Sequence, residues 1–194
     1  MPRPSQEDAI LAAALRCFAD LGYDGTRVRH IAERAGVTEG ALYRHYASKE
    51  DLAQALYGRY MGMYSDQLRR IAAADAPLQE RLLDCLRASL DSYRAQPDAM
   101  TFTLMRQHTF MPALPPDYAY PIDIIQGLIR DGQEAGLVRD GQPNLLAAIF
   151  LGCLLRPLIV SQLTTPGALD LLNDHQHDQT ILDAAWAALA RPPS

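Results

Sequence analysis

The chain has 194 residues, a hydrophobic fraction of 48% and a formal net charge of −5 at pH 7. This length and composition are typical of a folded protein with one or two cores, and they exclude a disordered chain. The longest uninterrupted apolar run, residues 145–155, is shorter than the roughly 18 residues of a membrane span, and the N-terminus lacks the order of a signal peptide. We therefore expect a cytoplasmic protein with no membrane partner.

The first 25 residues predict one helix followed by a turn. Ser5 is the expected N-cap, and Gly22 is expected to end the helix before a turn at residues 23–25. The apolar side chains that recur at helical spacing and should face inward are Ile10, Ala14, Cys17, Phe18 and Leu21.

The next segment reads TRVRHIAERAGVTEGALYRHYASK, and it predicts two short helices, a tight turn and the start of a further helix. Thr26 is expected to cap the first helix, and Gly36 to end it in a conformation with positive φ. Thr38 is expected to cap the second helix. Leu42 and Tyr46 should form its inward face, so that its other side chains point outward.

Two short helices joined by a glycine-containing turn present a recognition helix to the DNA major groove in helix-turn-helix proteins. Arg44 can reach a guanine edge or a phosphate, and the Tyr43 hydroxyl can donate to a phosphate oxygen. Thr26 and Lys49 begin helices whose free N–H groups are suited to phosphate. The predicted DNA-binding residues are Thr26, Arg27, Thr38, Glu39, Gly40, Ala41, Tyr43, Arg44, His45 and Lys49.

The distribution of charge supports DNA contact through one end of the chain. Residues 26–49 hold five basic and two acidic side chains, whereas residues 51–194 hold 11 arginines and 16 acidic side chains. A modest basic patch on a small head and an acidic body favour binding by the head alone. The patch is small for one copy, so we expect two copies to bind together.

The run TRVRHIAERAGVTEGALYRHYASKEDL, with FADLGYDGT overlapping its start, resembles the DNA-binding signature of the TetR family of bacterial transcriptional regulators. The resemblance covers roughly residues 5–55, and Tyr46 takes a place often filled by Phe. It implies a homodimeric, small-molecule-responsive regulator, most often a repressor, that binds a palindromic DNA operator.

The rest of the chain predicts further helices at residues 48–74, 77–94, 97–111, 121–134, 144–163 and 178–190. Residues 111–121 contain four prolines and cannot form a continuous helix. We therefore predict an all-α protein of about nine helices. Residues 1–50 form its DNA-binding domain, and residues 51–194 form a ligand-binding and dimerisation domain that a long helix joins to it.

The predicted helix at 144–163 is apolar nearly all round, so it must be buried on every side. The C-terminal part of this chain is poorly placed to surround it, and a second subunit is the expected cover. Ala148 and Gly152 would let a partner helix approach closely. We predict a four-helix dimer interface made by this helix, the helix at 178–190 and their symmetry mates.

A small-molecule effector would bind the body, and the candidate residues are aromatic, sulfur-containing or polar side chains there. Arg156 interrupts an apolar run before Pro157, and it needs an anion, either an acid of this fold or a ligand carboxylate. Each of the others has an alternative role as an ordinary core residue. The predicted ligand-binding residues are Tyr93, Phe102, Met105, Arg106, His108, Phe110, Tyr118, Tyr120, Phe150 and Arg156.

We predict no catalytic site, cofactor or metal. His175 and His177 form an H-x-H pattern, which is only a weak metal signal, and Cys17, Cys85 and Cys153 are too widely separated to suggest more than core positions. No nucleophile motif or phosphate-binding glycine loop occurs. Two alternatives stay open: an all-helical protein whose body binds a small ligand or a protein partner without regulating DNA, and an all-helical enzyme.

Overall fold

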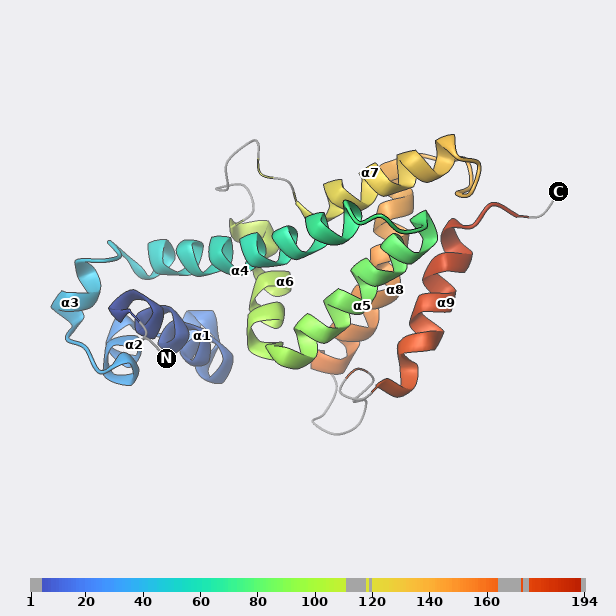
Figure 1. The fold of residues 1–194 in the computed structure, drawn as a ribbon. Helices are drawn as coiled ribbons and strands as arrows, with labels where there is room; N and C mark the ends of the chain where they lie inside the picture. Colours follow the sequence, from blue (N-terminus) through green and yellow to red (C-terminus); the bar gives the residue numbers. More distant parts are fainter. Residues whose placement is uncertain (1–4, 111–117, 119, 164–171, 173–174, 193–194) are drawn as a thin grey trace. The chain divides into compact units, whose positions relative to one another are not determined.

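The computed structural model describes residues 5–110, 118, 120–163, 172 and 175–192, apart from the side chains of Met105, Gln107, His108 and residues 161–163. These residues are predominantly helical, as predicted (Figure 1). Within the described part of the chain, the only β contact is an isolated antiparallel bridge between Val138 and Ala190. The all-α prediction is confirmed.

The helices lie close to their predicted ranges because most of their boundaries are set by local caps, glycines and prolines. In chain order they are α1 (Gln6–Gly25), α2 (Val28–Ala35), α3 (Glu39–Tyr43), α4 (Lys49–Ala72), α5 (Leu78–Ala95), α6 (Pro97–Phe110), α7 (Pro121–Glu134), α8 (Pro143–Leu163) and α9 (Asp178–Leu189). A short 3-10 helix, η2 (His175–His177), comes directly before α9.

The described residues fall into two compact units. The first contains residues 5–62, residues 96–110 and Tyr118, and the second contains residues 63–95 and the described residues from 120 to 192. Helix α4 contributes its first part to one unit and its last part to the other. The first unit is larger than the predicted domain of residues 1–50, because α6 packs on α1 although it lies far away in the sequence.

Aromatic side chains explain why α6 belongs to the first unit. Phe102 of α6 stacks on Phe18 of α1, with ring centroids 5.4 Å apart and planes inclined by 9°. Phe110 of α6 lies 5.8 Å from the ring of Tyr57 in α4, and its carbonyl accepts a hydrogen bond of 3.1 Å from the Gln54 side chain. These large buried rings form one core with α1 and α4.

Helix α1 starts as predicted but ends differently. Ser5 caps it, and the Ser5 hydroxyl accepts a 3.1 Å hydrogen bond from the Asp8 N–H. Gly22, with φ 70° and ψ 162°, kinks the helix without ending it, and the helix continues to Gly25. Leu21 is 50% exposed, so its predicted inward position is wrong: it lies directly before the kink, and the buried face ends at Phe18.

In the second unit, α8 packs against α7 and α9, and α5 packs against α7, α8 and α9 (Figure 1). Its core consists largely of aliphatic side chains with Phe150 of α8 among them. By burying leucine and isoleucine on several helices, the unit gains the apolar burial that dominates folding free energy. The fully buried side chains of this core include Leu82, Leu86, Leu90, Ile125 and Phe150.

Helix α8 keeps one apolar face exposed in the single chain. Leu145 is 58% exposed and Ile149 is 44% exposed, and Ala148 between them is also exposed. By length and composition alone, residues 143–160 are apolar enough to cross a membrane, with a mean hydropathy of 1.8 and a third of the window buried. The core helix of a soluble protein passes the same test.

Candidate DNA-binding site

The helix-turn-helix forms in the first unit, and its turn has the predicted geometry. Gly36 ends α2 in the left-handed conformation, with φ 69° and ψ 33°. Thr38 caps α3, and its hydroxyl accepts a 3.1 Å hydrogen bond from the Ala41 N–H. Both predictions are confirmed, because a glycine at positive φ and a threonine N-cap act through neighbouring residues alone.

Thr26 does not cap α2, which begins at Val28 with Arg27 as its N-cap. The Thr26 side chain points back to α1, where its hydroxyl lies 2.9 Å from the Cys17 carbonyl and 2.7 Å from the Gly22 carbonyl. Thr26 is 1% exposed. The predicted cap is therefore wrong, because the kinked end of α1 leaves carbonyl oxygens that need a donor. The place of Thr26 beside the start of α2, whose free N–H groups suit a phosphate, stays a prediction.

The inward and outward faces of α3 follow the prediction with one exception. Leu42 is fully buried and Tyr46, just after the helix, is 5% exposed, which confirms the predicted inward pair. Ala41 is 7% exposed, so its predicted outward position is wrong: it adjoins Leu42 on the inner side of a helix of five residues. The residues that remain exposed are Thr38, Glu39, Gly40, Tyr43, Arg44 and His45.

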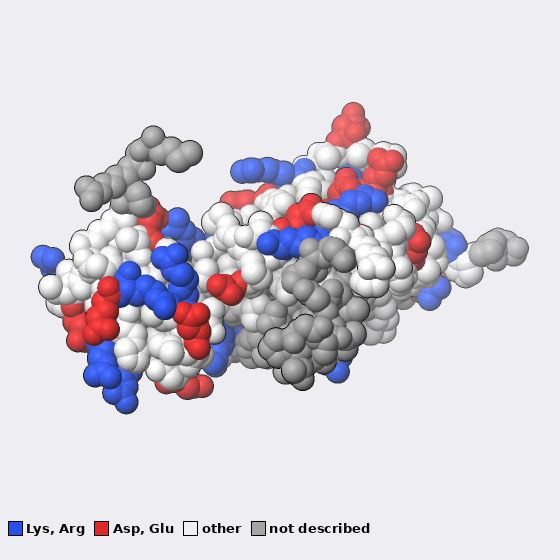
Figure 2. All heavy atoms as spheres, turned by 90° about the horizontal axis from the view of Figure 1, so that it is seen from below, with Lys and Arg blue, Asp and Glu red and all other residues white. Residues whose placement is uncertain are grey.

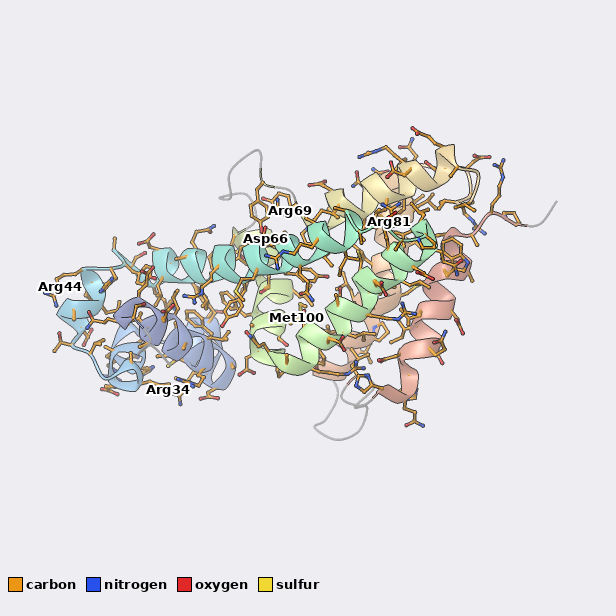
Figure 3. All side chains as sticks on the ribbon, in the orientation of Figure 1. Arg34, Arg44, Asp66, Arg69, Arg81 and Met100 are labelled. Atoms are coloured by element: carbon orange, nitrogen blue, oxygen red, sulfur yellow. The ribbon has the colours of Figure 1, made fainter. Side chains whose placement is uncertain are left out.

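Arg44 and Tyr43 give this exposed face its chemistry. Tyr43 is 50% exposed, and Arg44 lies on the outer side of α3 in Figure 3. His45 is also exposed, but its Nε2 lies 3.3 Å from the side-chain oxygen of Gln6. A guanidinium and a phenol on a short helix can both donate to DNA, to base edges or to phosphate oxygens.

Lys49 is in a different environment from the other predicted DNA-binding residues. Its ammonium donates to the carbonyl oxygens of Tyr23 at 2.9 Å and Thr26 at 3.1 Å. The same nitrogen lies 4.4 Å from the centroid of the Tyr23 ring. Two of its three N–H groups are therefore used inside the first unit.

The basic side chains of the helix-turn-helix differ in their availability. Arg27 and Arg29 are exposed on α2, whereas Arg34 pairs with Asp20 of α1 at 2.6 Å. Figure 2 shows basic and acidic side chains interspersed over the surface of this unit, at the left of the view. Arg29 is not among the DNA-binding residues predicted from the sequence, where it contributed only to the net charge of the segment. Its exposure on α2 makes it a further candidate for DNA contact.

The predicted ligand-binding residues are divided between the two units. Phe102 and Phe110 belong to the aromatic core of the first unit. Arg106, also on α6, lies 4.8 Å from the Tyr23 ring centroid and 3.7 Å from the Asp24 carboxylate. Tyr118, of the first unit as well, is partly exposed.

The other predicted ligand-binding residues with described side chains, Arg156 apart, belong to the second unit. There Tyr93 and Phe150 are buried, and Tyr120 is partly exposed. The side chains of Met105 and His108 lie outside the described residues.

Arg156 does not meet the predicted anion within the described part of the chain. It is exposed on α8, and no described carboxylate lies within 4.0 Å of its guanidinium. Water can satisfy this guanidinium in the single chain, so the prediction that Arg156 meets an acid of the fold or a ligand carboxylate stays a prediction. Helix α8 continues past Pro157 to Leu163.

The H-x-H pattern leads to a salt bridge in the described residues. His175 Nδ1 lies 2.9 Å from the Asp178 carboxylate, and Arg94 of α5 donates to the same carboxylate at 2.5 and 3.0 Å. Among the described residues no group of three or more His, Cys, Asp or Glu side chains is placed to hold a metal ion.

Residues 10–56 match the family model of bacterial regulatory proteins of the tetR family. The transcriptional repressor KstR2 of Mycobacterium tuberculosis is 34% identical over 88 residues, which are 45% of this chain and 44% of KstR2. The chain spans about half or less of the length of the curated relatives that it matches. The residues that match the family model cover most of α1, the helix-turn-helix and the start of α4.

Two solved structures resemble the chain over nearly its whole length. The regulator FadR of Bacillus subtilis, solved in complex with stearoyl-CoA, has a TM-score of 0.76 at 19% identity and covers 93% of this chain and 97% of its own. SmeT, the repressor of the Stenotrophomonas maltophilia multidrug efflux pump SmeDEF, has a TM-score of 0.72 at 22% identity, with 97% and 92% covered. These likenesses show a common fold. Residues 10–56 therefore match the DNA-binding region of the tetR family of bacterial regulatory proteins, and the whole chain shares its fold with regulators such as FadR and SmeT.

Proposed function

We propose that the protein is a homodimeric, small-molecule-responsive transcriptional repressor that binds a palindromic DNA operator through α3. The observation that carries the proposal is the orientation of α3: Leu42 and Tyr46 hold it to the core, while Tyr43 and Arg44 stay exposed. A helix held in this way can enter the major groove, where base edges distinguish all four base pairs.

The exposed residues of α3 have distinct expected roles. Arg44 carries the charge that a guanine edge or a phosphate attracts, and the Tyr43 hydroxyl can donate to a phosphate oxygen. Beyond its chain neighbours and its own helix backbone, nothing lies within 4 Å of a Cβ built at Gly40, so this glycine leaves open space at the surface where a groove wall can approach. Arg27 and Arg29 at the start of α2 add positive charge beside α3.

Dimerisation is supported by the exposed apolar face of α8. Leu145, Ala148 and Ile149 lie on this face, and Ala184 and Ala187 are exposed on α9. Covering such a face with a second copy removes apolar surface from water, at roughly 25 cal/mol per Å². Two heads about 34 Å apart would enter successive major grooves of a palindromic site.

Repression and ligand response are proposed from the relatives. KstR2 and SmeT are both repressors by name, and FadR of Bacillus subtilis was solved in complex with stearoyl-CoA. A ligand that favours a different arrangement of the two heads weakens DNA binding, and DNA must weaken ligand binding by the same factor.

The test is a titration of the protein with duplexes from its own upstream region, followed by selection from random duplexes if none binds. Arg44→Ala should weaken binding about tenfold, because a good bidentate contact contributes about 1–3 kcal/mol. Arg87→Ala is the matched control, since Arg87 is an exposed arginine of α5 paired with Asp84. Equal binding by both variants, or no selected duplex, would contradict the proposed function and favour a body that binds a partner without regulating DNA.

A further inference from the structure

The C-terminal end of α1 is negatively charged and lacks a basic residue of its own. Asp20 and Asp24 lie near this end, and the last turn of the helix contains no basic side chain. The unpaired carbonyl groups at a helix C-terminus add partial negative charge. A cation from elsewhere in the first unit is therefore favoured at this place.

Three other helices each supply a cationic side chain to the C-terminal end of α1. Arg34 of α2 pairs with Asp20 at 2.6 Å, Arg106 of α6 lies 3.7 Å from Asp24, and Lys49 of α4 binds backbone carbonyls. The two arginine pairs are partly exposed, and pairs of this kind contribute little to stability. Lys49 has the most complete set of contacts among the three.

The position of Lys49 is not explained by its own helix. It is the first residue of α4, where the positive end of the helix dipole disfavours a cation and favours the acids Glu50 and Asp51 that follow. The end of α1 does explain it. The ammonium donates hydrogen bonds to the carbonyl oxygens of Tyr23 at 2.9 Å and Thr26 at 3.1 Å, and it lies over the face of the Tyr23 ring. Cations are attracted to such a face.

Thr26 gives this contact its importance for DNA binding. Its hydroxyl is bound to α1 and its carbonyl to Lys49, and it directly precedes Arg27, the N-cap of α2. Whatever holds Thr26 therefore sets where α2 begins, and α3 follows α2 after one short turn.

We propose that Lys49 is a positioning residue, which holds the connection between α1 and α2 against α4 and so orients α3, and that it does not neutralise a DNA phosphate. The inference rests on the proposed function and concerns how the reading helix is held. We call the contact of Lys49 with Tyr23 and Thr26 the clip. The ring and the carbonyl of Tyr23 both contact Lys49, and the Tyr23 hydroxyl donates to Glu50 at 3.2 Å.

Salt dependence separates the two roles of a lysine. Each phosphate that a protein neutralises contributes about −0.9 to the slope of log Kobs against log salt concentration. A residue that only orients the reading helix changes the affinity and leaves this slope unchanged. The comparison requires variants that are fully folded, which circular dichroism at the temperature of the titration establishes.

The first experiment compares Lys49→Met with Arg44→Met on one duplex over a range of salt concentrations. We expect Lys49→Met to weaken binding about tenfold with an unchanged slope, because charged hydrogen bonds of this kind contribute about that much. Arg44→Met should reduce the magnitude of the slope by about 0.9 if it loses a phosphate contact. A slope reduced for Lys49→Met by the same amount, or an affinity equal to that of the unsubstituted protein, would overturn the proposal.

The second experiment does not depend on DNA and separates this inference from the proposed function. In a double-mutant cycle on urea unfolding, Lys49→Met and Tyr23→Leu should be non-additive by about fivefold in the unfolding equilibrium constant. Tyr23→Phe keeps the ring and should leave the coupling with Lys49 in place. Additive effects would overturn the role of the Tyr23 ring in the clip, even if DNA is bound, because Tyr23→Leu leaves the backbone carbonyls that Lys49 binds in place. If no duplex is bound but the coupling is found, the proposed function fails and the clip remains.

Discussion

The hydroxyl of Tyr46 donates to the carboxylate of Glu7 at a distance of 3.2 Å, and this hydrogen bond joins the residues after α3 to the first turn of α1. Tyr46 is 5% exposed. Burial, the negative charge of Glu7 and the hydrogen bond raise the pKa of Tyr46 to about 12. The inner side of the reading helix is thus held by a polar contact as well as by apolar packing.

Stability should fall at high pH because several acidic protons are held more tightly in the folded state. Burial is the main cause that raises the pKa values of Tyr23, Tyr46, Tyr64 and the Cys85 thiol to about 12. Their ordinary values are 10.0 for tyrosine and 9.0 for cysteine. The stabilisation is therefore complete below about pH 9 and is lost as the pH rises through about 12.

Urea unfolding at a series of pH values between about 8 and 12 measures this loss. Tyr46→Phe should show a smaller decrease in the free energy of unfolding over the same range, because one of the titrating groups is absent. A free energy that stays constant up to pH 12 would contradict the expected linkage.

Gly132→Ala should destabilise the second unit. A Cβ at Gly132 would lie 2.5 Å from Val138 and 2.6 Å from Leu78, and overpacking of this kind costs about 1–3 kcal/mol. Gly127 is the matched control on the same helix, because nothing lies within 4 Å of its added Cβ. Gly127→Ala should stabilise by up to about 1 kcal/mol through helix propensity. Thermal unfolding of both variants should show a lower midpoint temperature for Gly132→Ala and a higher one for Gly127→Ala.

Asp178→Asn should destabilise the start of α9. Burial alone would raise the pKa of Asp178, but hydrogen bonds from Arg94 and His175 outweigh it and lower the pKa below 3.8. This stabilisation is present above pH 3.8 and is lost as the pH falls through the lower folded value. Because the pair is only partly buried, we expect a loss of about 1–2 kcal/mol at neutral pH.

The control for this carboxylate is Asp84→Asn, since Asp84 pairs with Arg87 on the exposed side of α5. Its effect on the free energy of unfolding in urea should be below about 0.5 kcal/mol. Equal effects of the two substitutions would show that the Arg94 contacts contribute no more than a surface pair.

Thr26→Val should lower the free energy of unfolding by about 1–3 kcal/mol, because it removes the hydroxyl that donates to the carbonyls of Cys17 and Gly22. Thr26→Ser keeps the hydroxyl and should lose less. The slope of DNA affinity against salt should not change in either variant, because threonine carries no charge and releases no counterion from DNA. Equal unfolding free energies for Thr26→Val and Thr26→Ser would show that the hydrogen bonds of the Thr26 hydroxyl do not stabilise the end of α1.

Ile149→Asp should convert the proposed dimer to a monomer, because a carboxylate would be buried without a partner in the α8 interface. Met63→Asp is the control, since Met63 is 55% exposed on α4, a helix outside the predicted interface. Light scattering at micromolar concentration should give twice the chain mass for the control and the chain mass for Ile149→Asp. A monomeric unsubstituted protein would exclude the dimer.

The helices and the outward side of α3 were predictable from the sequence because they depend on neighbours a few residues apart. Gly36 and Thr38 form the turn with their own backbone, and the spacing of Leu42 and Tyr46 directs one side of the recognition segment inward. The same local pattern gave wrong predictions for Ala41 and Leu21. Ala41 is buried beside Leu42, and Leu21 is exposed because it directly precedes the kink at Gly22.

Only the tertiary structure decided how the ends of these helices are used. Nothing near Thr26 in the sequence indicates that its hydroxyl bonds to α1, and nothing near Lys49 indicates that its ammonium binds the carbonyl of a residue 26 positions earlier. The placement of α6 on α1 depends in the same way on rings 84 positions apart, Phe18 and Phe102. Local periodicity determines which residues become helical, but donors, acceptors and rings find their partners only when distant helices pack together.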